Sequence, residues 1–243
     1  MTRAVDIVLT AQLAAGLNFR RKTAVVIDVL RATTSILTLL ERGAQRIYPV
    51  ADLGEARGLH RSLPEALLCG ERGGVPPRGF DLGNSPAAFS RLELGGRQIV
   101  FTTTNGTQAI RGAAGAGTVL LACLRNASAA AEAAALGQGP VLLVCSGTEG
   151  RFSSEDFYAA GLIAGSLAAR GYLLSDLAWT AALLARIPLE EAVNARTCAH
   201  LRFLIDTGFE EDVRFCLCGE VSRLVPRYHP AEAGGYIGRL ESG

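Results

Sequence analysis

The sequence predicts an α/β fold, with helices layered on both faces of a largely parallel or mixed sheet (α/β/α). The first observation is size and composition: the 243 residues are 49% hydrophobic and 19% charged, which is enough apolar material for a substantial core. The second is an alternation of short apolar runs with helix-like segments, which is typical of strands buried between helices. The third is a polar turn that recurs directly after several of these runs.

Seven apolar runs indicate strands, at residues 6–9, 24–29, 46–50, 66–69, 98–101, 118–123 and 141–145. Helical patterns follow at residues 33–42, 53–62, 107–113, 128–136 and 153–170. Residues 176–206 read as helical with a break near Pro188, and "RFCLC" (214–218) and "RLVP" (223–226) suggest late strands. These elements form one domain over residues 1–243, or two closely packed α/β halves with the site between them.

One long segment has no regular pattern. It is the glycine and proline cluster "GERGGVPPRGFDLGNSP" at residues 70–86. Loops of this length in compact domains are usually functional or disordered. The apolar side chains of Phe80 and Leu82 favour an ordered loop.

Charge and targeting signals narrow the class of protein. The formal net charge of +1 provides no field that favours nucleic acid or an anionic membrane as partner. The first residues, "MTRAVDIVLT", lack a signal peptide, and no apolar stretch approaches 18 residues. The six cysteines show no disulfide or zinc spacing. We therefore expect a cytoplasmic protein, and the alanine-rich segments 129–135 and 176–195 offer a face for a homodimer.

Four polar turns follow apolar runs, in "VVIDVLRATTS", "IVFTTTNGT", "LLACLRNAS" and "LLVCSGTEGRFSS". In open α/β sheets the strand ends face a common crevice, where helix N-termini present N–H groups and partial positive charge. Small hydroxyl and amide residues are also ordinary helix caps. Four such turns, three of them carrying arginine, favour an anion-binding site.

The spacing of Cys145 and Arg151 matches the phosphate loop of cysteine-dependent phosphatases, where a thiolate attacks phosphorus. However, Val144 stands where such loops have histidine, and Phe152 stands where they have a hydroxyl residue. The apolar run before Cys145 would raise its thiol pKa. We predict that Cys145 is a packing residue and that Arg151 contacts the anion, with nucleophilic Cys145 as the alternative.

Several carboxylates accompany these turns. Asp28 ends a buried run, where a charge is costly unless it is coordinated or paired, for example with Arg31. Glu71, Asp81 and Asp156 lie near other turns, although Asp156 would also suit the first turn of a helix. Together these carboxylates suit Mg²⁺, which binds one or two protein carboxylates, waters and phosphate oxygens.

The motifs "IDVLRATTS", "GERGG…GFDLGNSP", "TTTNGT" and "GTEGRFSSEDFYAAG", in this order, resemble the 2-phosphosulfolactate phosphatase family. The resemblance extends from about residue 5 to residue 230. It implies a family-specific α/β fold and an Mg²⁺-dependent acid phosphatase, a class first associated with coenzyme M biosynthesis. The implied substrate is a small anionic phosphate ester, most simply 2-phosphosulfolactate, which would yield sulfolactate and phosphate.

The resemblance also implies a set of site residues. The implied catalytic residues are Asp28, Arg31 and Arg151. The implied metal ligands are Asp28, Glu71, Asp81 and Asp156. The implied substrate-binding residues are Thr33, Thr34, Arg72, Asn84, Ser85, Thr103, Thr104, Asn105, Gly106, Thr107, Gly147 and Ser153.

Three functions stay open at this point. The first is an Mg²⁺-dependent phosphatase in which water or an enzyme group attacks in line. The second keeps the fold but uses Cys145 as a covalent nucleophile. The third is a non-catalytic anion or nucleotide sensor, against which Asp28, Glu71 and Asp81 argue, because a sensor has less need of metal-binding acids.

Overall fold

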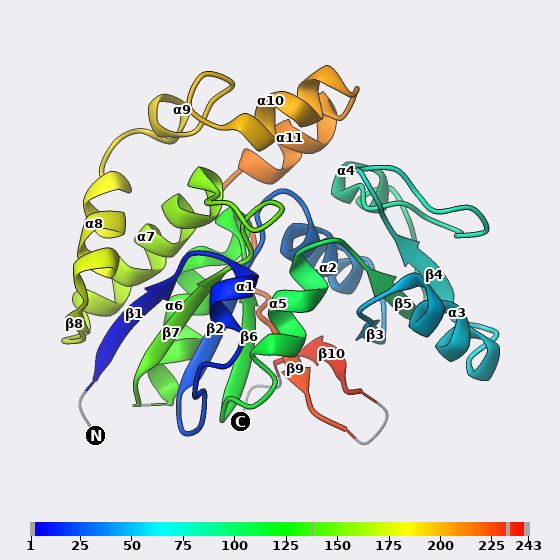
Figure 1. Cartoon of the computed structure of the whole chain (residues 1–243), viewed down its shortest axis with the longest axis horizontal. Helices are drawn as coiled ribbons and strands as arrows, with labels where there is room; N and C mark the ends of the chain where they lie inside the picture. The colour runs from blue at the N-terminus through cyan, green and yellow to red at the C-terminus, as the bar shows by residue number, and fades with distance from the viewer. Residues whose placement is uncertain (1–2, 138, 232–233, 241–243) are drawn as a thin grey trace.

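The structure is a computed structural model that describes residues 3–137, 139–231 and 234–240. Ten strands are found in these ranges, and all belong to one sheet (Figure 1). They are β1 (Ala4–Val8), β2 (Thr23–Ile27), β3 (Arg46–Pro49), β4 (Leu67–Gly70), β5 (Gln98–Thr102), β6 (Thr118–Ala122), β7 (Val141–Cys145), β8 (Leu173–Leu174), β9 (Pro226–His229) and β10 (Tyr236–Arg239).

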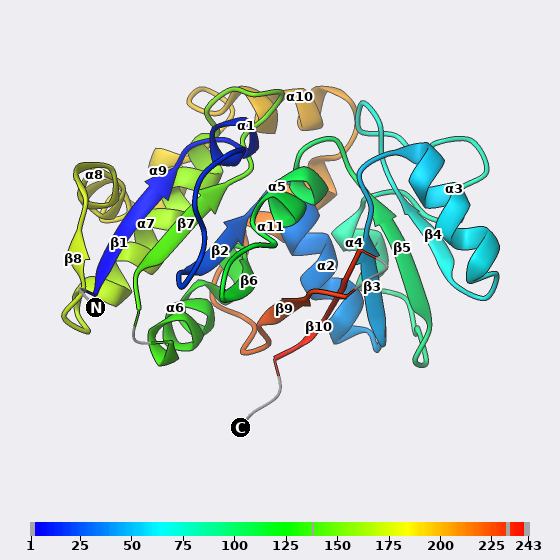
Figure 2. The same ribbon diagram turned by 60° about the horizontal axis from the view of Figure 1, so that its bottom comes forward.

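The sheet consists of two parallel blocks joined by a hairpin. Its strand order is β4-β5-β3-β10-β9-β6-β2-β7-β1-β8. Strands β4, β5 and β3 are parallel to one another, as are β6, β2, β7, β1 and β8. The antiparallel pair β9–β10 lies between the blocks (Figure 2). The mixed sheet confirms the predicted α/β fold class.

The carboxyl ends of β2 and β5 meet although the two blocks are antiparallel to each other through the hairpin. Neighbouring strands twist by roughly 20–25°, and the twist accumulates over the strands between β2 and β5. A Cβ built on Gly106, after β5, would lie 2.4 Å from the Cβ of Ala32 and 2.7 Å from Oδ2 of Asp28, after β2. Loops from both blocks therefore contribute to one site.

Eleven α-helices lie in the described ranges. They are α1 (Ala11–Ala14), α2 (Ala32–Glu41), α3 (Leu53–Ser62), α4 (Pro86–Phe89), α5 (Gly106–Gly112), α6 (Ala127–Leu136), α7 (Ser154–Ala168), α8 (Asp176–Leu184), α9 (Leu189–Ala192), α10 (Ala199–Asp206) and α11 (Glu210–Leu217). Helices α6 and α7 pack on one face of the sheet, and α2 and α5 pack on the other. Helices therefore cover both faces of the sheet, as the sequence predicts.

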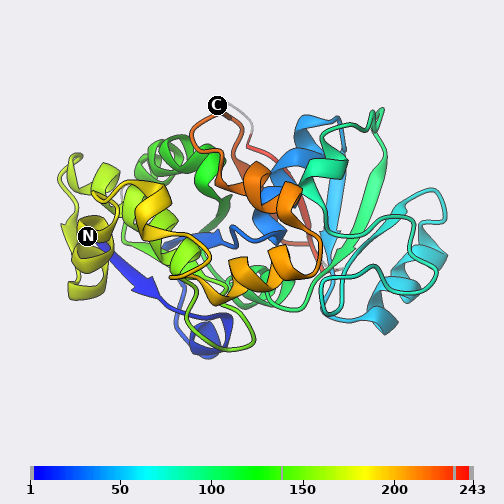
Figure 3. The ribbon, with the colours of Figure 1, turned by 90° about the horizontal axis from the view of Figure 1, so that it is seen from above.

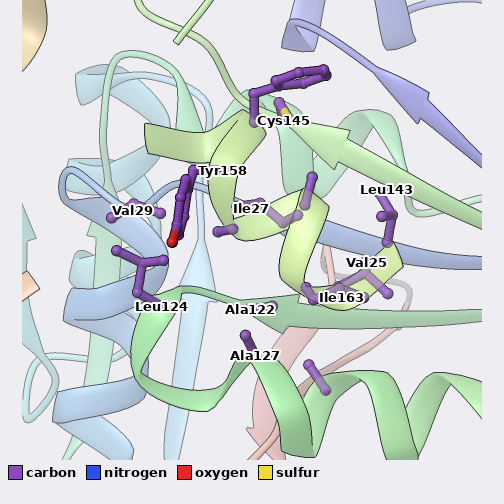
Figure 4. Packing of buried hydrophobic residues seen from close by; sticks show 14 of the residues in the cluster. Val25, Ile27, Val29, Ala122, Leu124, Ala127, Leu143, Cys145, Tyr158 and Ile163 are labelled. Atoms are coloured by element: carbon purple, nitrogen blue, oxygen red, sulfur yellow. The ribbon is translucent and has the colours of Figure 1, made fainter. Parts of the chain in front are cut away.

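The core lies on both faces of the central strands. Strand β2 is buried along its whole length. Val25 and Ile27 face α7, where they pack near Ile163 and Tyr158 (Figure 4), and Val26 faces α2 and α5. A strand buried on both faces reads as a continuous apolar run, which is why the sequence identifies it.

Helices α9, α10 and α11 lie across the carboxyl ends of the strands (Figure 3). This segment is amphipathic: α10 buries Leu201 and Leu204, and α11 buries Val213 and Cys216. Side chains from α10 and from the residue before it line the cavity described below. The segment predicted to be helical at residues 176–206 thus forms α8, α9 and α10, and the last two of these helices continue with α11 as the cover over the strand ends.

The two predicted late strands are wrong. Residues 214–217 of "RFCLC" belong to α11, whose buried positions 212, 213 and 216 follow the helical period. Three acidic residues in the first turn also favour this helix. The short apolar run is ambiguous between strand and helix because it is too short for periodicity to decide. Of "RLVP", only Pro226 lies in a strand, at the start of β9.

Two further expectations concern surfaces. On α6, Ala129, Ala130, Ala131 and Ala134 are buried in the core of this chain, so these alanines do not offer the surface for a homodimer. On α8, Ala178 and Ala181 are buried as well. Among the described helices, none has both the length and the apolar character needed to cross a membrane.

Candidate active site

Asp28 stands at the centre of the site, immediately after β2. Its Oδ1 accepts a hydrogen bond from the backbone N–H of Ala32 at 2.9 Å. Its Oδ2 lies against the backbone of Gly106 and accepts no hydrogen bond within the described ranges. Burial raises the pKa of Asp28 to about 6, although the hydrogen bond from Ala32 acts in the opposite direction. The carboxylate is thus poorly solvated, and one of its oxygens can bind a ligand.

The two threonines that follow Asp28 hold its loop in place. Oγ1 of Thr33 accepts from the N–H of Asp28 at 2.9 Å and lies 2.7 Å from the carbonyl oxygens of Asp28 and Ala122. Oγ1 of Thr34 donates to the carbonyl of Val29 at 2.8 Å. Both side chains are buried and lie outside the cavity lining. The structure places these predicted substrate ligands beneath the loop.

Arg31 forms a buried ion pair with Asp212 of α11. Its Nη1 lies 2.7 Å from Oδ2 of Asp212, and its Nη2 donates to the carbonyl of Gly74 at 3.0 Å. The guanidinium also stacks on the ring of Phe209, with Cζ 4.2 Å from the ring centroid. Arg31 lines the cavity, but its charge is neutralised by Asp212, a residue that the sequence motifs did not identify.

Asp212 also holds the segment after the long loop. Its Oδ1 accepts from Oγ of Ser85 at 2.7 Å and from the N–H of Ala87 at 3.1 Å. Ser85 is the N-cap of α4 and lies outside the cavity lining. Asn84 does line the cavity, and its buried Oδ1 has no hydrogen-bond partner in the described part of the chain. Of these two predicted residues, Asn84 is placed to contact a ligand.

Glu71 connects the loops after β4 and β5. Its Oε1 accepts from the N–H and Oγ1 of Thr104, at 2.9 and 3.1 Å. Its Oε2 accepts from the N–H of Gly74 at 2.9 Å. Glu71 lines the cavity, so it can contact a ligand while it holds both loops. Arg72 points elsewhere, donating to Oγ1 of Thr102 at 2.9 Å, and lies outside the lining.

Asp81, a predicted metal ligand, is also outside the cavity lining. Its Oδ2 accepts from the N–H of Leu68 in β4 at 2.8 Å. The carboxylate therefore attaches the long loop, which the structure shows as ordered and irregular, to the edge strand. The geometry gives Asp81 a structural contact, and its metal-binding role stays a prediction.

The "TTTNGT" turn joins β5 to α5, as predicted. Thr103 and Thr107 bond to each other through their hydroxyl and backbone groups, while Thr103, Thr104 and Asn105 line the cavity. Gly106, predicted to bind substrate, lies outside the cavity lining, and its missing Cβ permits close approach to Asp28 and Ala32. The turn thus faces the cavity through its second to fourth residues, and Thr107 lies outside the lining.

The loop between β7 and α7 supplies Arg151. This residue is exposed, lines the cavity, and forms no side-chain hydrogen bond or ion pair with the described residues. Ser153, the N-cap of α7, also lines the cavity, and its buried Oγ has no partner there. Both groups lie beside the N-terminus of a 15-residue helix, where backbone N–H groups favour an anion.

Asp156 secures this loop to the loop after β2. Its Oδ1 accepts from the N–H of Val29 at 2.8 Å, and its Oδ2 accepts from the N–H of Gly147 at 3.1 Å. Burial, followed by the negative charges of Asp28 and Glu155, raises its pKa well above the usual range. Asp156 and Gly147, predicted to bind metal and substrate, lie outside the cavity lining. Gly147 has φ +67° and packs closely on the carbonyl of Arg151.

Cys145 lies at the end of β7, with its side chain in the core beside α7 (Figure 4). It is 1% exposed and lies outside the cavity lining. Burial, with the charges of Asp156 and Glu155, raises the thiol pKa well above its usual value. A thiol in these surroundings is neither ionised nor accessible at neutral pH. This observation disfavours the cysteine-nucleophile alternative.

The cavity itself has a volume of about 510 Å³, which suits a small ligand. It also contains Glu155, which lies in the fourth motif but was not among the predicted site residues, and Cys198, His200 and Phe203 of the α10 segment, which no motif includes. Sγ of Cys198 donates to Oε2 of Glu155 at 2.8 Å. The covering helices therefore complete a site whose floor comes from the strand ends.

The donor set bears on the predicted Mg²⁺. Within the described ranges, no three His, Cys, Asp or Glu side chains are grouped so as to hold a metal ion. Mg²⁺ needs only one or two carboxylates when water and phosphate oxygens complete its octahedron. Asp28 and Asn84 both line the cavity, and each has a hard side-chain oxygen without a hydrogen-bond partner in the described part of the chain. These residues fit Mg²⁺ better than a metal held entirely by protein side chains.

Comparison with known proteins identifies relatives along most of the chain. A sequence profile described as 2-phosphosulpholactate phosphatase matches residues 8–230. A protein of Carboxydothermus hydrogenoformans named probable 2-phosphosulfolactate phosphatase is 41% identical, covering 88% of this chain and 90% of the relative. Proteins of the same name from Deinococcus radiodurans (42%; 86% and 88%) and Clostridium acetobutylicum (33%; 94% and 98%) also match.

Proposed function

Because the chain belongs to the 2-phosphosulfolactate phosphatase family, and is thus a phosphoric monoester hydrolase, we propose that it converts 2-phosphosulfolactate and water to sulfolactate and phosphate with Mg²⁺. The relatives carry this substrate in their names. The observation that supports the proposal most strongly is that one small cavity is lined both by the Asp28 carboxylate and by the Arg151 guanidinium, which has no side-chain partner among the described residues. A metal ion needs the carboxylate as a ligand, and a phosphate group needs the cation.

In this proposal, Asp28 would hold the metal, and Asn84 would supply a second protein oxygen. Mg²⁺, when bound, would neutralise charge on the phosphoryl oxygens and so favour attack at phosphorus. Glu71, in the cavity lining, and Asp156, outside it, hold the loops of the site, because their oxygens already accept two or more hydrogen bonds from loop groups. Both carboxylates keep the loops at the positions that Asp28 requires.

Arg151 and Ser153 bind the anionic substrate in this proposal. The guanidinium can form charge-assisted hydrogen bonds with phosphate, carboxylate or sulfonate oxygens. The hydroxyl of Ser153 and the N-terminus of α7 add donors beside it. Phe152, the residue between Arg151 and Ser153 in the sequence, is 52% exposed and forms part of the cavity wall. The substrate is thus held between a cation and a carboxylate site.

The proposal is tested by phosphate release from a panel of monoesters, measured in metal-free protein with and without added Mg²⁺. We expect turnover of 2-phosphosulfolactate that disappears on chelation and returns with Mg²⁺. Calorimetry of Mg²⁺ binding to the wild type and to Asp28→Asn provides a readout independent of activity. Full turnover in excess chelator would exclude the metal, and phosphate binding without turnover of any ester would indicate a sensor.

The assembly of the protein stays part of the proposal. With the alanines of α6 buried, the homodimer predicted from the sequence would use α8, where Leu177, Trp179 and Leu183 are exposed. Light scattering of the purified protein tests this: Trp179→Glu should convert a dimer to monomers. A monomeric wild type would exclude the homodimer.

A further inference from the structure

His200 is a titratable side chain that lines the cavity. The chain has three histidines, and within the described ranges His200 is the one that lines the cavity. It lies in the first turn of α10, on the covering segment. None of the motifs that predict the site includes His200, because it lies beyond the last of them in the sequence.

A buried carboxylate orients the imidazole. Nδ1 of His200 lies 3.3 Å from Oε1 of Glu155, whose side chain is 1% exposed. The same nitrogen lies 3.1 Å from Oγ1 of Thr148. An ionised carboxylate can only accept a hydrogen bond, so the proton belongs on Nδ1. Nε2 is then left without a partner in the described part of the chain, on a residue that lines the cavity.

The carboxylate of Glu155 lies next to the imidazole of His200, and other charged groups line the same cavity. The first turn of α10 disfavours a positive charge, and the adjacent carboxylate of Glu155 opposes that effect. Although burial would raise the pKa of Glu155, its hydrogen bonds with His200 and Cys198 keep that pKa below its usual value. The charged groups that line the cavity with His200 are Asp28, Arg31, Glu71, Glu149, Arg151 and Glu155.

We propose that His200 is the general acid of the phosphatase reaction and that Glu155 positions it. This inference rests on the phosphatase function proposed above. As the bond between phosphorus and the ester oxygen breaks, its electron pair goes to the ester oxygen, which takes the proton from Nε2 and leaves as an alcohol. Water forms the new bond to phosphorus, and the H₂PO₄⁻ product returns one proton to the imidazole. Atoms and charge balance over the cycle.

The need for such an acid depends on the leaving group. A secondary alkoxide, as in 2-phosphosulfolactate, is a strong base and leaves poorly without a proton, whereas 4-nitrophenolate leaves readily. General acid catalysis typically contributes about 10²–10⁴-fold. We therefore expect His200→Asn to lower kcat at least about a hundredfold with the alkyl ester and less than about tenfold with 4-nitrophenyl phosphate.

Two controls make the comparison decisive. His60→Asn changes a histidine of α3 outside the cavity and should keep kcat within about twofold. Competitive inhibition by inorganic phosphate should be unchanged in His200→Asn, since the proposed role is proton transfer. If His200→Asn does not fold, His200→Gln undergoes the same two-substrate comparison.

The pH profile separates a catalytic from a structural role. In the wild type, turnover of the alkyl ester should fall as pH rises and the imidazolium loses its proton, and this limb should vanish in His200→Asn. In Glu155→Gln the limb should move to lower pH, because the imidazolium loses the negative charge that stabilises it.

Three outcomes overturn the role of His200: less than tenfold loss with the alkyl ester, equal losses with both esters, or a parallel loss of phosphate affinity. A wild type that hydrolyses no alkyl ester would instead contradict the proposed function.

Discussion

The loop after β2, and the loop after β7 together with the first turn of α7, each carry one aspartate and one arginine, and they use them in opposite ways. After β2, Asp28 keeps an oxygen available while Arg31 is paired with Asp212. After β7, both oxygens of Asp156 accept backbone hydrogen bonds while Arg151 has no side-chain partner among the described residues. Of these four residues, the first segment therefore leaves the carboxylate of Asp28 available in the cavity, and the second leaves the guanidinium of Arg151 available.

This difference shows that residue type at a strand end does not decide function. A charged side chain contacts a ligand only if the rest of the fold leaves it without a partner. Asp156 and Arg31 are largely satisfied by the protein and hold the loops together, whereas Asp28 and Arg151 can bind a metal ion and an anion. The following predictions test this division of roles.

The largest effect is expected from Asp28→Asn. The substitution keeps the shape and the hydrogen bond from Ala32 but removes the charge, so turnover should fall by about a thousandfold, comparable to the loss of a major electrostatic contact. Steady-state kinetics at saturating Mg²⁺ is the measurement. Near-normal turnover would make Asp28 structural, like Asp156.

Arg31→Ala should act mainly on stability. Removing one partner of a buried ion pair leaves Asp212 charged and unpaired, at a typical cost of about 3–5 kcal/mol. Urea denaturation measures this loss. Arg31→Ala combined with Asp212→Ala should recover part of it, since no uncompensated charge remains. A stable Arg31→Ala with lost activity would instead show that Arg31 acts on the substrate.

The burial of Asp28 predicts a pH dependence of stability in metal-free protein. Its pKa is raised from 3.8 to about 6 in the folded state, so the folded state binds more protons between these values and stability falls as pH rises through this window. Asp28→Asn should therefore be more stable than the wild type at pH 7, by up to roughly 3 kcal/mol. The difference should vanish below about pH 4, and urea denaturation at both pH values checks this. Equal stability at pH 7 would contradict the predicted cost of burying Asp28.

Arg151→Ala should lose at least about a hundredfold in turnover, equivalent to about 2.7 kcal/mol. Because the side chain is exposed and unpaired, its stability should stay within about 0.5 kcal/mol of the wild type. Kinetics and thermal unfolding of the same preparation separate the two effects. A destabilised protein with normal turnover would reverse the roles assigned to Arg31 and Arg151.

The smallest effect is expected from Cys145→Ser. Because the thiol is buried and outside the cavity, turnover should stay within about tenfold of the wild type, about 1.4 kcal/mol in the barrier. Mass spectrometry after reaction with a thiophosphate ester should find no adduct. A trapped adduct at Cys145 would restore the cysteine-nucleophile mechanism.

Strands β1 to β7, and the meeting of three of the four polar turns at one cavity, could be predicted from the sequence. Buried strands such as β2 are continuous apolar runs, and the polar turns that end them must lie at the sheet edge. The loops that carry Asp28, Thr104 and Arg151 do meet at one cavity. The late strands were predicted wrongly, because "RFCLC" is too short for its period to distinguish a helix from a strand.

The partner of each polar side chain was decided only by the tertiary structure. Arg31 and Asp212 are 181 residues apart in the chain, and no local pattern pairs them. The same holds for His200, which reaches the cavity because α10 folds back over the strand ends. Local sequence determines periodicity and turns, since these depend on neighbouring residues. Whether a charge stays available depends on desolvation and on contacts from distant segments, which exist only after the chain has folded.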